Sequence, residues 1–374
     1  MKLLFLDTKP IRRGAQVFVD DLSHHFHEDG IAIKKVYLYA YHETVKLSLL
    51  DEDTELNGNE NHIFEKIPTI HPGLLLRLIK TINAWNPDFV LLNGSRTLKY
   101  GAAAKPFLYK NTKLIYRIID SPKFWNRSIL KQFYYRKLIL SNIDAAVGVS
   151  QASLNDMVAL HGYKKPTTVI HRAIQENKFK NVSSKENCRF KFNIKNTDNV
   201  LLFLGNLTPQ KRPDRFVEII KLVKQNFPQI KAWIVGDGVL RQETEVLIYK
   251  YDLQNNVKFW GYQQNVTDLI AASDLLVLSS DTEGLPGVVL ECGYLGVPTV
   301  SANVGGINEC LENGKTGYVV QTQNPEEYAT YIFDLLNNDE KCKSMGALSM
   351  QKVKSGFTMD IVAEKYLQFF HSLK

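Results

Sequence analysis

The sequence predicts an α/β fold with two doubly wound domains that face each other across a cleft, and three observations support it. The chain has 374 residues, enough for two domains of ordinary size, each with its own core. In both halves, short apolar runs typical of buried parallel strands alternate with segments of helical periodicity. Several runs end at glycine or small polar residues, at the sheet edge where such folds bind ligands.

The first half begins with a predicted strand at residues 3–6, LLFL, followed by a loop at 9–16 and an amphipathic helix. If the sheet is parallel, the loop at 93–96, which follows the strand at 89–92, lies at the same edge as Gly14. Further strands of this half are expected at residues 31–39, 113–118, 143–149 and 168–170.

The second half is predicted to form a separate domain. A polar, lysine-rich stretch at 177–197 is expected to link a first domain, residues 1–176, to a second, residues 198–356. The terminal segment, 357–374, has the pattern of a helix. Strands of the second domain are expected at residues 200–204, 232–235, 257–260 and 275–278.

The stretch 281–299, DTEGLPGVVLECGYLGVPT, carries the strongest functional signal. It follows an apolar strand, and Pro286 suits the first turn of a helix, so a helix is predicted from near Gly287. Glu283 then lies in the loop and Glu291 about one turn inside the helix, so both carboxylates can face one cleft. Free N–H groups of the first turn favour a phosphate, and carboxylates suit neutral hydroxyls. The alternative is that both glutamates are solvated surface residues, but the apolar surroundings favour a nucleotide-sugar site.

The segment EGLPGVVLE, followed by CGYLGVPTVSANVGGINECLENGKTGYVV, resembles the C-terminal signature of family 4 retaining glycosyltransferases with the GT-B fold. The resemblance extends back through VLLFLGNLTPQKRPDRFVEII, AWIVGDGVLRQETE and NVKFWGYQQNVTDLIAASDLLVLSS, and covers nearly all of residues 200–320. It implies two Rossmann-like domains, the first binding mostly the acceptor and the second mostly the nucleotide-sugar donor. It also implies that the terminal helix, within 357–374, crosses back and packs on the first domain.

The resemblance implies roles for individual residues of this chain. Glu291 is expected to bind the ribose hydroxyls, Glu283 the transferred sugar, and Lys211 the diphosphate. The expected catalytic residues are Glu283, Lys211 and Asp120. The expected donor-binding residues are Gly14, Gly205, Asn206, Lys211, Gly236, Tyr262, Glu283, Gly284, Leu285, Gly287, Val288 and Glu291, and the expected acceptor-side residues are Arg13, Asn93, Ser95 and Asp120.

Two positions depart from the family pattern. Many relatives carry a His before the aspartate at the end of the strand 113–118, where this chain has Ile119, so Asp120 or the loop 93–96 would take part of its role. Asp120 could instead cap the helix that follows. Relatives commonly carry an Arg at the position of Asn206, which brings no charge. Arg212 or an arginine of the first domain would then compensate at the diphosphate.

These observations predict a glycosyltransferase that moves a sugar from a nucleotide-diphosphate sugar, most commonly a UDP-sugar in this family, to a hydroxyl of a saccharide or lipid-linked acceptor. The resemblance implies retention of anomeric configuration without a metal ion or other cofactor, in cell-surface polysaccharide or glycolipid synthesis. Asp51-Glu52-Asp53 has the DxD form of metal-dependent transferases of another fold, but it lies in a polar stretch at 49–60 that is predicted to be a loop. The alternatives are a nucleotide-sugar 2-epimerase and a non-catalytic nucleotide-sugar-binding subunit, the latter favoured by Ile119 and Asn206.

Charge is unevenly distributed along the chain. Residues 1–180 hold 26 Lys and Arg against 17 Asp and Glu, a net charge of +9, whereas residues 181–374 hold 20 against 22, a net charge of −2. This asymmetry predicts an anionic membrane surface or a lipid-linked diphosphate as partner of the first half, rather than nucleic acid. The alternative is that the lysines only solubilise the surface. Residues 122–140 mix aromatic and basic side chains, which predicts either an interfacial membrane helix or a half-buried helix with Leu130, Phe133, Tyr134 and Leu138 toward the core.

No apolar run approaches the roughly 18 residues that a spanning helix needs, and the opening MKLLFLDTKP is too brief for a signal peptide. A cytoplasmic location is therefore expected, with peripheral contact at the inner face of the cell membrane. The cysteines show no metal-ligand spacing and are expected to be free thiols; they are Cys188, Cys292, Cys310 and Cys342.

Overall fold

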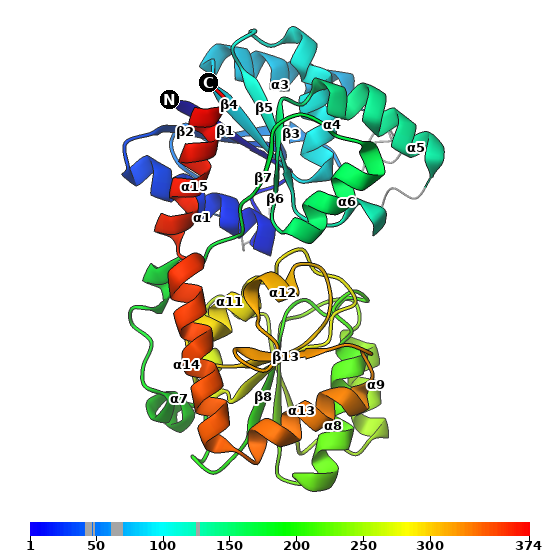
Figure 1. Ribbon diagram of the computed structural model, residues 1–374, viewed down its shortest axis with the longest axis vertical. Coiled ribbons are helices and arrows are strands. Elements are labelled where there is room, and N and C mark those ends of the chain that lie inside the picture. The colour runs from blue at the N-terminus through cyan, green and yellow to red at the C-terminus, as the bar shows by residue number, and fades with distance from the viewer. Residues whose placement is uncertain (42–46, 48, 61–69, 125–127) are drawn as a thin grey trace. The chain divides into compact units, whose positions relative to one another are not determined.

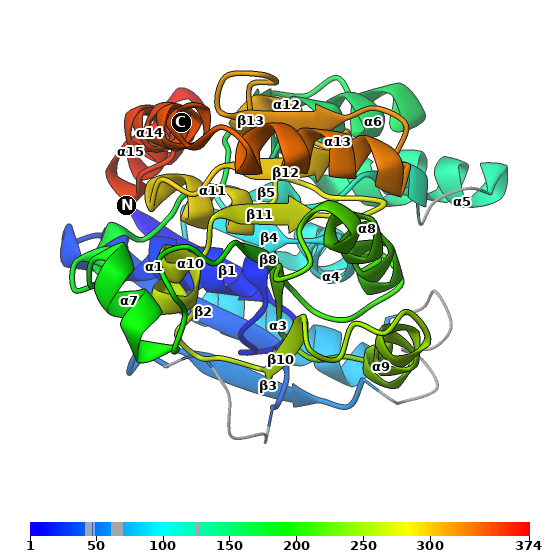
Figure 2. The same cartoon turned by 90° about the horizontal axis from the view of Figure 1, so that it is seen from below.

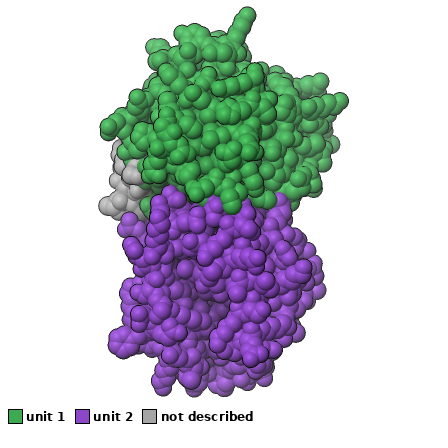
Figure 3. Space-filling model, turned by 60° about the vertical axis from the view of Figure 1, so that its left-hand side comes forward, with its two compact units in different colours: residues 1–172, 359–374 green, residues 173–358 purple. Residues whose placement is uncertain are grey.

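The structure is a computed structural model that describes residues 1–41, 47, 49–60, 70–124 and 128–374. The chain divides into two compact units, coloured separately in Figure 3. Unit 1 comprises residues 1–172 and 359–374, and unit 2 comprises residues 173–358. Two α/β units, each with a parallel sheet, confirm the predicted fold class.

Unit 1 contains a seven-stranded sheet in the order β3-β2-β1-β4-β5-β6-β7, and its paired strands are parallel (Figure 1). Its strands are β1 Lys2–Asp7, β2 Ala32–Tyr39, β3 Thr54–Gly58, β4 Phe89–Asn93, β5 Lys113–Ile118, β6 Ala145–Gly148 and β7 Thr167–Val169. Its α-helices are α1 Gly14–Glu28, α3 Pro72–Trp85, α4 Ser95–Ala104, α5 Ile129–Tyr134, α6 Gln151–His161 and α15 Met359–Ser372. Short 3-10 turns, η1 Lys105–Phe107, η2 Pro122–Phe124 and η4 Leu140–Asn142, and a π-helical turn, η3 Tyr135–Ile139, connect them.

Unit 2 contains a six-stranded sheet in the order β10-β9-β8-β11-β12-β13, also parallel. Helices α8, α9 and α13 lie on one side of this sheet and α10, α11 and α14 on the other (Figure 2). Its strands are β8 Val200–Leu204, β9 Lys231–Val235, β10 Val257–Gly261, β11 Leu275–Leu278, β12 Thr299–Ala302 and β13 Gly317–Val320. Its helices are η5 Glu176–Phe179, α7 Lys185–Lys191, α8 Pro213–Asn226, α9 Arg241–Lys250, α10 Thr267–Ala272, α11 Gly287–Tyr294, α12 Ile307–Cys310, α13 Pro325–Leu336 and α14 Asp339–Gly356.

Two segments differ from their sequence assignments. The stretch 49–60, predicted to be a loop, contains the edge strand β3, which pairs with β2 and is too short and polar to give a clear strand pattern. The stretch 177–197, predicted to be a linker, contains α7 and belongs to unit 2. Arg189 of α7 is 3% exposed and binds the Asp274 carboxylate at 2.6 Å, so this segment is packed in spite of its polar composition.

The last helix, α15, belongs to unit 1, whereas α14 before it belongs to unit 2. Tyr366 of α15 is fully buried, and its hydroxyl accepts a hydrogen bond from Arg117 Nε at 3.2 Å. The Phe370 ring stacks on Phe89 of β4 with their centroids 5.1 Å apart. The final residues of the chain therefore complete the core of a unit that begins at residue 1.

Other sequence expectations can be compared directly with the structure. The four cysteines are free thiols, as expected. Within the described residues, no helix is both long enough and apolar enough to cross a bilayer.

A buried ion cluster joins α1, β2 and the loop before β3. Lys35 is 1% exposed, and its Nζ lies 2.6 Å from Asp20 Oδ1 and 3.2 Å from Asp53 Oδ2. Asp53 also accepts backbone N–H bonds from Lys35 at 2.8 Å and Leu50 at 2.7 Å. The last carboxylate of the DxD-like motif is thus a structural group in unit 1.

Lys35→Met should lower the free energy of unfolding by about 3–5 kcal/mol, because it leaves two buried carboxylates without their cation. Urea denaturation measures the loss. Lys34→Met, at the neighbouring and partly exposed position, removes the same charge and should cost less than about 1 kcal/mol. Equal losses in the two variants would contradict the assignment.

Candidate active site

The carboxyl ends of β8 and β11 meet at the centre of the unit 2 sheet, where strands on either side run outward in opposite sequence order. Doubly wound sheets bind ligands in the crevice outside such a switch point. Two loops leave the sheet here, one from Gly205 to Arg212 and the other from Ser279 to Pro286. Both were predicted to carry donor-binding residues.

An ion pair joins the two loops. Lys211 Nζ lies 2.5 Å from Glu283 Oε1, and Ser280 Oγ donates to the same oxygen at 2.7 Å. The Glu283 side chain is 10% exposed and the Lys211 side chain 26%, so the pair is partly shielded from water but remains accessible to a ligand. Sequence reasoning placed both residues in the donor site but did not predict that they contact each other.

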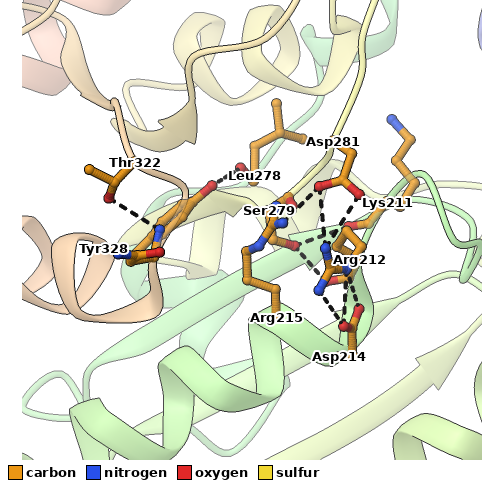
Figure 4. Close-up of polar contacts among 10 residues, drawn as sticks. Lys211, Arg212, Asp214, Arg215, Leu278, Ser279, Asp281, Thr322 and Tyr328 are labelled. Atoms are coloured by element: carbon orange, nitrogen blue, oxygen red, sulfur yellow. Dashed lines mark hydrogen bonds and ion pairs between the residues drawn. The ribbon is translucent and has the colours of Figure 1, made fainter. Parts of the chain in front are cut away.

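Arg212 and Arg215 hold residues of the loop that carries Glu283 (Figure 4). Arg215 is 6% exposed and donates to the Ser279 carbonyl oxygen at 2.6 Å and to Asp281 Oδ1 at 2.7 Å. Arg212 holds Asp214 through its Nε and Nη2 and lies 3.3 Å from Asp281 Oδ2. Its bonds to Asp214 raise the pKa of the Arg212 guanidinium further above its ordinary value. In Figure 4 the Lys211 side chain points away from this cluster.

These contacts bear on the suggestion that Arg212 replaces the cation missing at position 206. Arg212 adopts a left-handed backbone conformation, with φ +51°, at the start of α8, and its guanidinium is engaged by two carboxylates. Its charge is therefore balanced locally. Asn206 is exposed beside Gly205, with a side chain that can donate a hydrogen bond but carries no charge.

Glycines allow the loops of this edge to approach one another closely. Gly236 has φ +131°, and a Cβ atom there would lie 2.1 Å from the Gly205 carbonyl oxygen. Gly305 has φ +54°, and a Cβ atom would lie 1.7 Å from the Glu283 carbonyl oxygen. The Gly306 N–H donates to the Gly284 carbonyl oxygen at 2.8 Å, which holds the backbone of the loop 279–286 against residues 305–306. Gly305 was not predicted as a site residue, although its signal was present in the Gly-Gly pair of VGGINE.

Helix α11 begins at Gly287, as predicted. Leu285 and Gly287 are buried, and Val288 and Glu291 are partly exposed. The first-turn N–H groups of this eight-residue helix follow directly after the loop that carries Glu283 and Gly284. Tyr262, which was expected to border the base, follows β10 at the same edge of the sheet and is 47% exposed.

The predicted acceptor-side residues lie at the edge of the unit 1 sheet formed by the carboxyl ends of its strands, and they differ in exposure. Arg13 is exposed at the start of α1, Ser95 opens α4, and Asp120 is exposed just after β5. Gly14, predicted to bind the donor, is exposed beside Arg13. Ile119 packs against Gly94, where a Cβ atom would lie 3.0 Å from Ile119 Cδ1. In the turn after Asp120, the Ser121 hydroxyl donates to the Asp156 carboxylate and accepts from the Lys123 N–H.

Asn93 differs from this group because it is 3% exposed and belongs to a buried polar chain. Its Nδ2 donates to Asp7 Oδ2 at 2.5 Å, and its Oδ1 accepts from Arg117 Nη1 at 2.9 Å. Asp7 Oδ1 accepts from the Thr8 N–H at 2.6 Å and from Gln16 Nε2 at 3.1 Å. Asn93 therefore supports the loops at this edge instead of presenting its amide to solvent.

Burial shifts the pKa of the Asp7 carboxyl in this polar chain. Asp7 is 2% exposed, and burial raises the pKa of its carboxyl to about 6, although the bonds from Asn93, Thr8 and Gln16 oppose the rise. Among the described residues, no three His, Cys, Asp or Glu side chains gather in a metal-ligand arrangement.

Two glycosyltransferase family models match successive parts of this chain. The model of the family described as Glycosyltransferase Family 4 matches residues 12–178, and that of Glycosyl transferases group 1 matches residues 184–350. An N-acetyl-alpha-D-glucosaminyl L-malate synthase from Bacillus anthracis is 26% identical over 62% of this chain and 60% of its own length. The UDP-Gal:alpha-D-GlcNAc-diphosphoundecaprenol alpha-1,3-galactosyltransferase of Escherichia coli is 25% identical over 70% and 64%. The chain thus spans about three fifths of the length of these curated relatives.

Solved structures resemble the whole chain. The Anabaena protein Alr3699/HepE, in complex with UDP and glucose, superposes with a TM-score of 0.82 over 100% of both chains at 20% identity. WaaG, a glycosyltransferase involved in lipopolysaccharide biosynthesis, has a TM-score of 0.76 at 15% identity, covering 98% of this chain and 99% of its own. At these identities the likeness establishes the fold.

The pKa of Asp7 predicts a pH dependence of stability. Because the folded-state pKa is above the ordinary 3.8, its contribution is fully present below pH 3.8 and is lost as the pH rises through about 6. Over that interval the protein should lose about 3 kcal/mol relative to Asp7→Asn, which cannot ionise. Urea unfolding of both proteins at pH 4 and pH 6.5 measures the difference, and parallel curves would contradict it.

Proposed function

Because the chain belongs to glycosyltransferase family 4, with the GT-B fold, we propose that it transfers a sugar from a nucleotide-diphosphate sugar to a hydroxyl of a saccharide or lipid-linked acceptor. The donor of first choice is a UDP-sugar. The transfer would retain the anomeric configuration and use neither a metal ion nor another cofactor, in the synthesis of a cell-surface polysaccharide or glycolipid. The protein would act in peripheral contact with an anionic membrane surface.

The observation that carries this proposal is the contact between Lys211 and Glu283 at the switch point of the unit 2 sheet. It brings one cation and one carboxylate together in front of the first turn of α11. A diphosphate can accept bonds from the ammonium group and the helix N–H groups, while a sugar hydroxyl can donate to a carboxylate. This edge of the unit 2 sheet therefore offers both kinds of partner that a nucleotide sugar requires.

The relatives support the choice of substrate classes. Alr3699/HepE was solved with UDP-glucose, and the Escherichia coli relative is named for UDP-Gal and a diphosphoundecaprenol-linked acceptor. A poly(ribitol-phosphate) alpha-N-acetylglucosaminyltransferase of Staphylococcus aureus is also similar, at 25% identity over 47% of this chain. These names favour UDP as the nucleotide and a surface polymer or lipid-linked glycan as the acceptor.

In the proposed reaction, the bond from the sugar C1 to the diphosphate oxygen breaks, and a bond from C1 to the acceptor oxygen forms on the same face. The acceptor proton passes to the departing diphosphate. Lys211 and the N–H groups of α11 would stabilise the negative charge that develops on that leaving group. Glu283 and Glu291 would fix the sugar and the ribose, so positioning replaces a strong protein base.

The ion pair also implies an exchange of partners. Lys211 Nζ donates to Glu283 Oε1 at 2.5 Å, so a diphosphate bound at Lys211 would compete with this carboxylate for the same cation. The carboxylate, once released, would be available to accept from a sugar hydroxyl. Donor binding would thus rearrange charges that are already paired.

UDP is the nucleotide proposed to bind, and a ligand that binds only the folded state raises the melting temperature. UDP should therefore raise the melting temperature more than GDP, ADP or inorganic diphosphate do.

Glu291→Ala should weaken UDP binding about tenfold or more by calorimetry, since it removes a charged acceptor of the ribose hydroxyls. The control is Glu340→Ala, an exposed glutamate of α14, which should bind UDP normally.

Product analysis separates the alternatives. Transfer from UDP-sugar to an acceptor, with the anomeric outcome read by NMR, supports the proposal. An epimerase would change the sugar without transferring it, and a binding subunit would hold UDP without releasing sugar. Failure of the nucleotide diphosphates to bind, or unchanged turnover by Glu291→Ala, would refute the proposed site.

Lys211→Ala and Glu283→Gln should have opposite effects on UDP. Removing the ammonium should weaken UDP binding about tenfold to a hundredfold, as expected for a charged hydrogen bond. Glu283→Gln should leave UDP binding equal or tighter, because Lys211 no longer has a competing carboxylate, while transfer falls about 100-fold. Titration calorimetry and initial rates measure the two effects. Equal weakening of UDP binding by both variants would contradict the proposed exchange.

A further inference from the structure

Residues 129–142 of unit 1 form one continuous helical segment that changes type along its length. Helix α5 passes into the π-helical turn η3 and then into the 3-10 turn η4. Tyr135, Ile139 and Leu140 of this segment are 2%, 3% and 4% exposed and belong to the core of unit 1. The segment is therefore anchored to the unit through these residues, and its other side faces solvent.

The solvent side is also apolar. Ile129 is 82% exposed, Leu130 83%, Phe133 61% and Leu138 60%. The alternative sequence interpretation placed Leu130, Phe133, Tyr134 and Leu138 in a core-facing stripe, and it is wrong for all of these except Tyr134, which packs against the core. A π-helical turn holds more residues than an α-helical turn and is often found at functional sites. Here the turn contains the buried Tyr135 and Ile139 and also the exposed Leu138.

Core packing does not explain these four exposed residues. They would be unfavourable in water, and four large apolar side chains on consecutive turns form a patch of the kind that binds a partner. Figures 1 and 2 both place α5 at the periphery of unit 1. We define Ile129, Leu130, Phe133 and Leu138 as the apolar patch.

The charges around the apolar patch indicate the kind of partner. Residues 121–143 contain five Lys or Arg and no Asp or Glu. Arg136 and Lys137 are exposed next to Leu138, and Lys131 lies between Leu130 and Phe133. Of the residues predicted for this basic-aromatic segment, Trp125 and Arg127 lie outside the described residues.

We infer that the apolar patch and its neighbouring cations dock unit 1 onto an anionic lipid bilayer. The aliphatic and aromatic side chains would enter the boundary between headgroups and acyl chains, and Lys131, Arg136 and Lys137 would reach the lipid phosphates. A protein partner would need an apolar surface against the apolar patch and carboxylates opposite its neighbouring cations. A bilayer supplies an apolar layer beneath a phosphate layer in one place. Anionic lipid therefore matches both the apolar patch and the cations.

This inference deepens the proposed function and rests on it for its purpose, because a lipid-linked acceptor would be presented at that surface. Binding to vesicles and transfer of sugar are separate measurements, so either can fail without the other. The strength of such binding depends on the apolar area buried in the bilayer and on the attraction of basic groups to anionic lipids. Because salt screens that attraction, the inferred contact should be sensitive to salt.

The test is sedimentation of the full chain with vesicles of phosphatidylcholine alone or with about 30% phosphatidylglycerol, at low and high salt. The protein should pellet with the anionic vesicles at low salt and be released at high salt. The triple variant Ile129→Ser, Leu130→Ser, Phe133→Ser should bind about tenfold or more weakly. Arg136→Gln with Lys137→Gln should weaken binding to anionic vesicles and flatten the salt dependence.

Phe190→Ser provides the matched control, because Phe190 is 85% exposed on α7 of unit 2 and lies outside the apolar patch. It should bind vesicles as the wild type does, and all variants should keep the wild-type melting temperature and UDP binding. The inference is overturned if the wild type stays in the supernatant with anionic vesicles, or if the triple variant pellets as the wild type does. It is also overturned if the apolar patch mediates self-association instead, seen as a wild-type dimer by sedimentation velocity that Phe133→Ser abolishes.

Discussion

The ion pair between Lys211 and Glu283 depends on the whole architecture of unit 2, because its two residues are 72 positions apart in the chain. Parallel strands bring the loops after β8 and β11 to the same edge. Arg215 and Arg212 then fix the second loop through Ser279 and Asp281, and Gly305 permits the backbone contact beneath Glu283. The short distance between the two charges is therefore a consequence of sheet order, buried arginine bonds and one glycine.

The two units support their loop edges by different means. In unit 2, the supporting charges are balanced locally, with two arginines facing Asp214 and Asp281. In unit 1, a single buried arginine, Arg117, is connected to the carboxylate of Asp7 only through the Asn93 amide among the bonds described. Its guanidinium also lies 4.3 Å from the centre of the Phe18 ring. In the first arrangement both arginines hold other carboxylates and Lys211 pairs with Glu283, whereas in the second the buried Asp7 carboxyl has a raised pKa.

Much of the fold could be predicted from the sequence, because buried parallel strands and helix starts leave local signals. The start of α11 at Gly287 follows from Pro286, and the central strands follow from apolar runs such as LLVL. Local signals failed where a long-range contact decides the structure. The edge strand β3 gains its regularity from β2, and α7 is held by the bond from Arg189 to Asp274. The meeting of Lys211 with Glu283 and the role of Gly305 likewise depend on distances that no single stretch of sequence encodes. The exposure of Leu130 and Phe133 required the structure as well, since either side of that segment is apolar enough to be a core face.

The discontinuous make-up of unit 1 has a consequence for biosynthesis. Residues 359–374 leave the ribosome only after all of unit 2 has been translated, yet they supply Tyr366 to Arg117 and Phe370 to Phe89. Until then the nascent amino-terminal half has an incomplete apolar interior and a buried guanidinium lacking one of its acceptors. Unit 2 is contiguous, so all of its residues have been synthesised before unit 1 has its last helix.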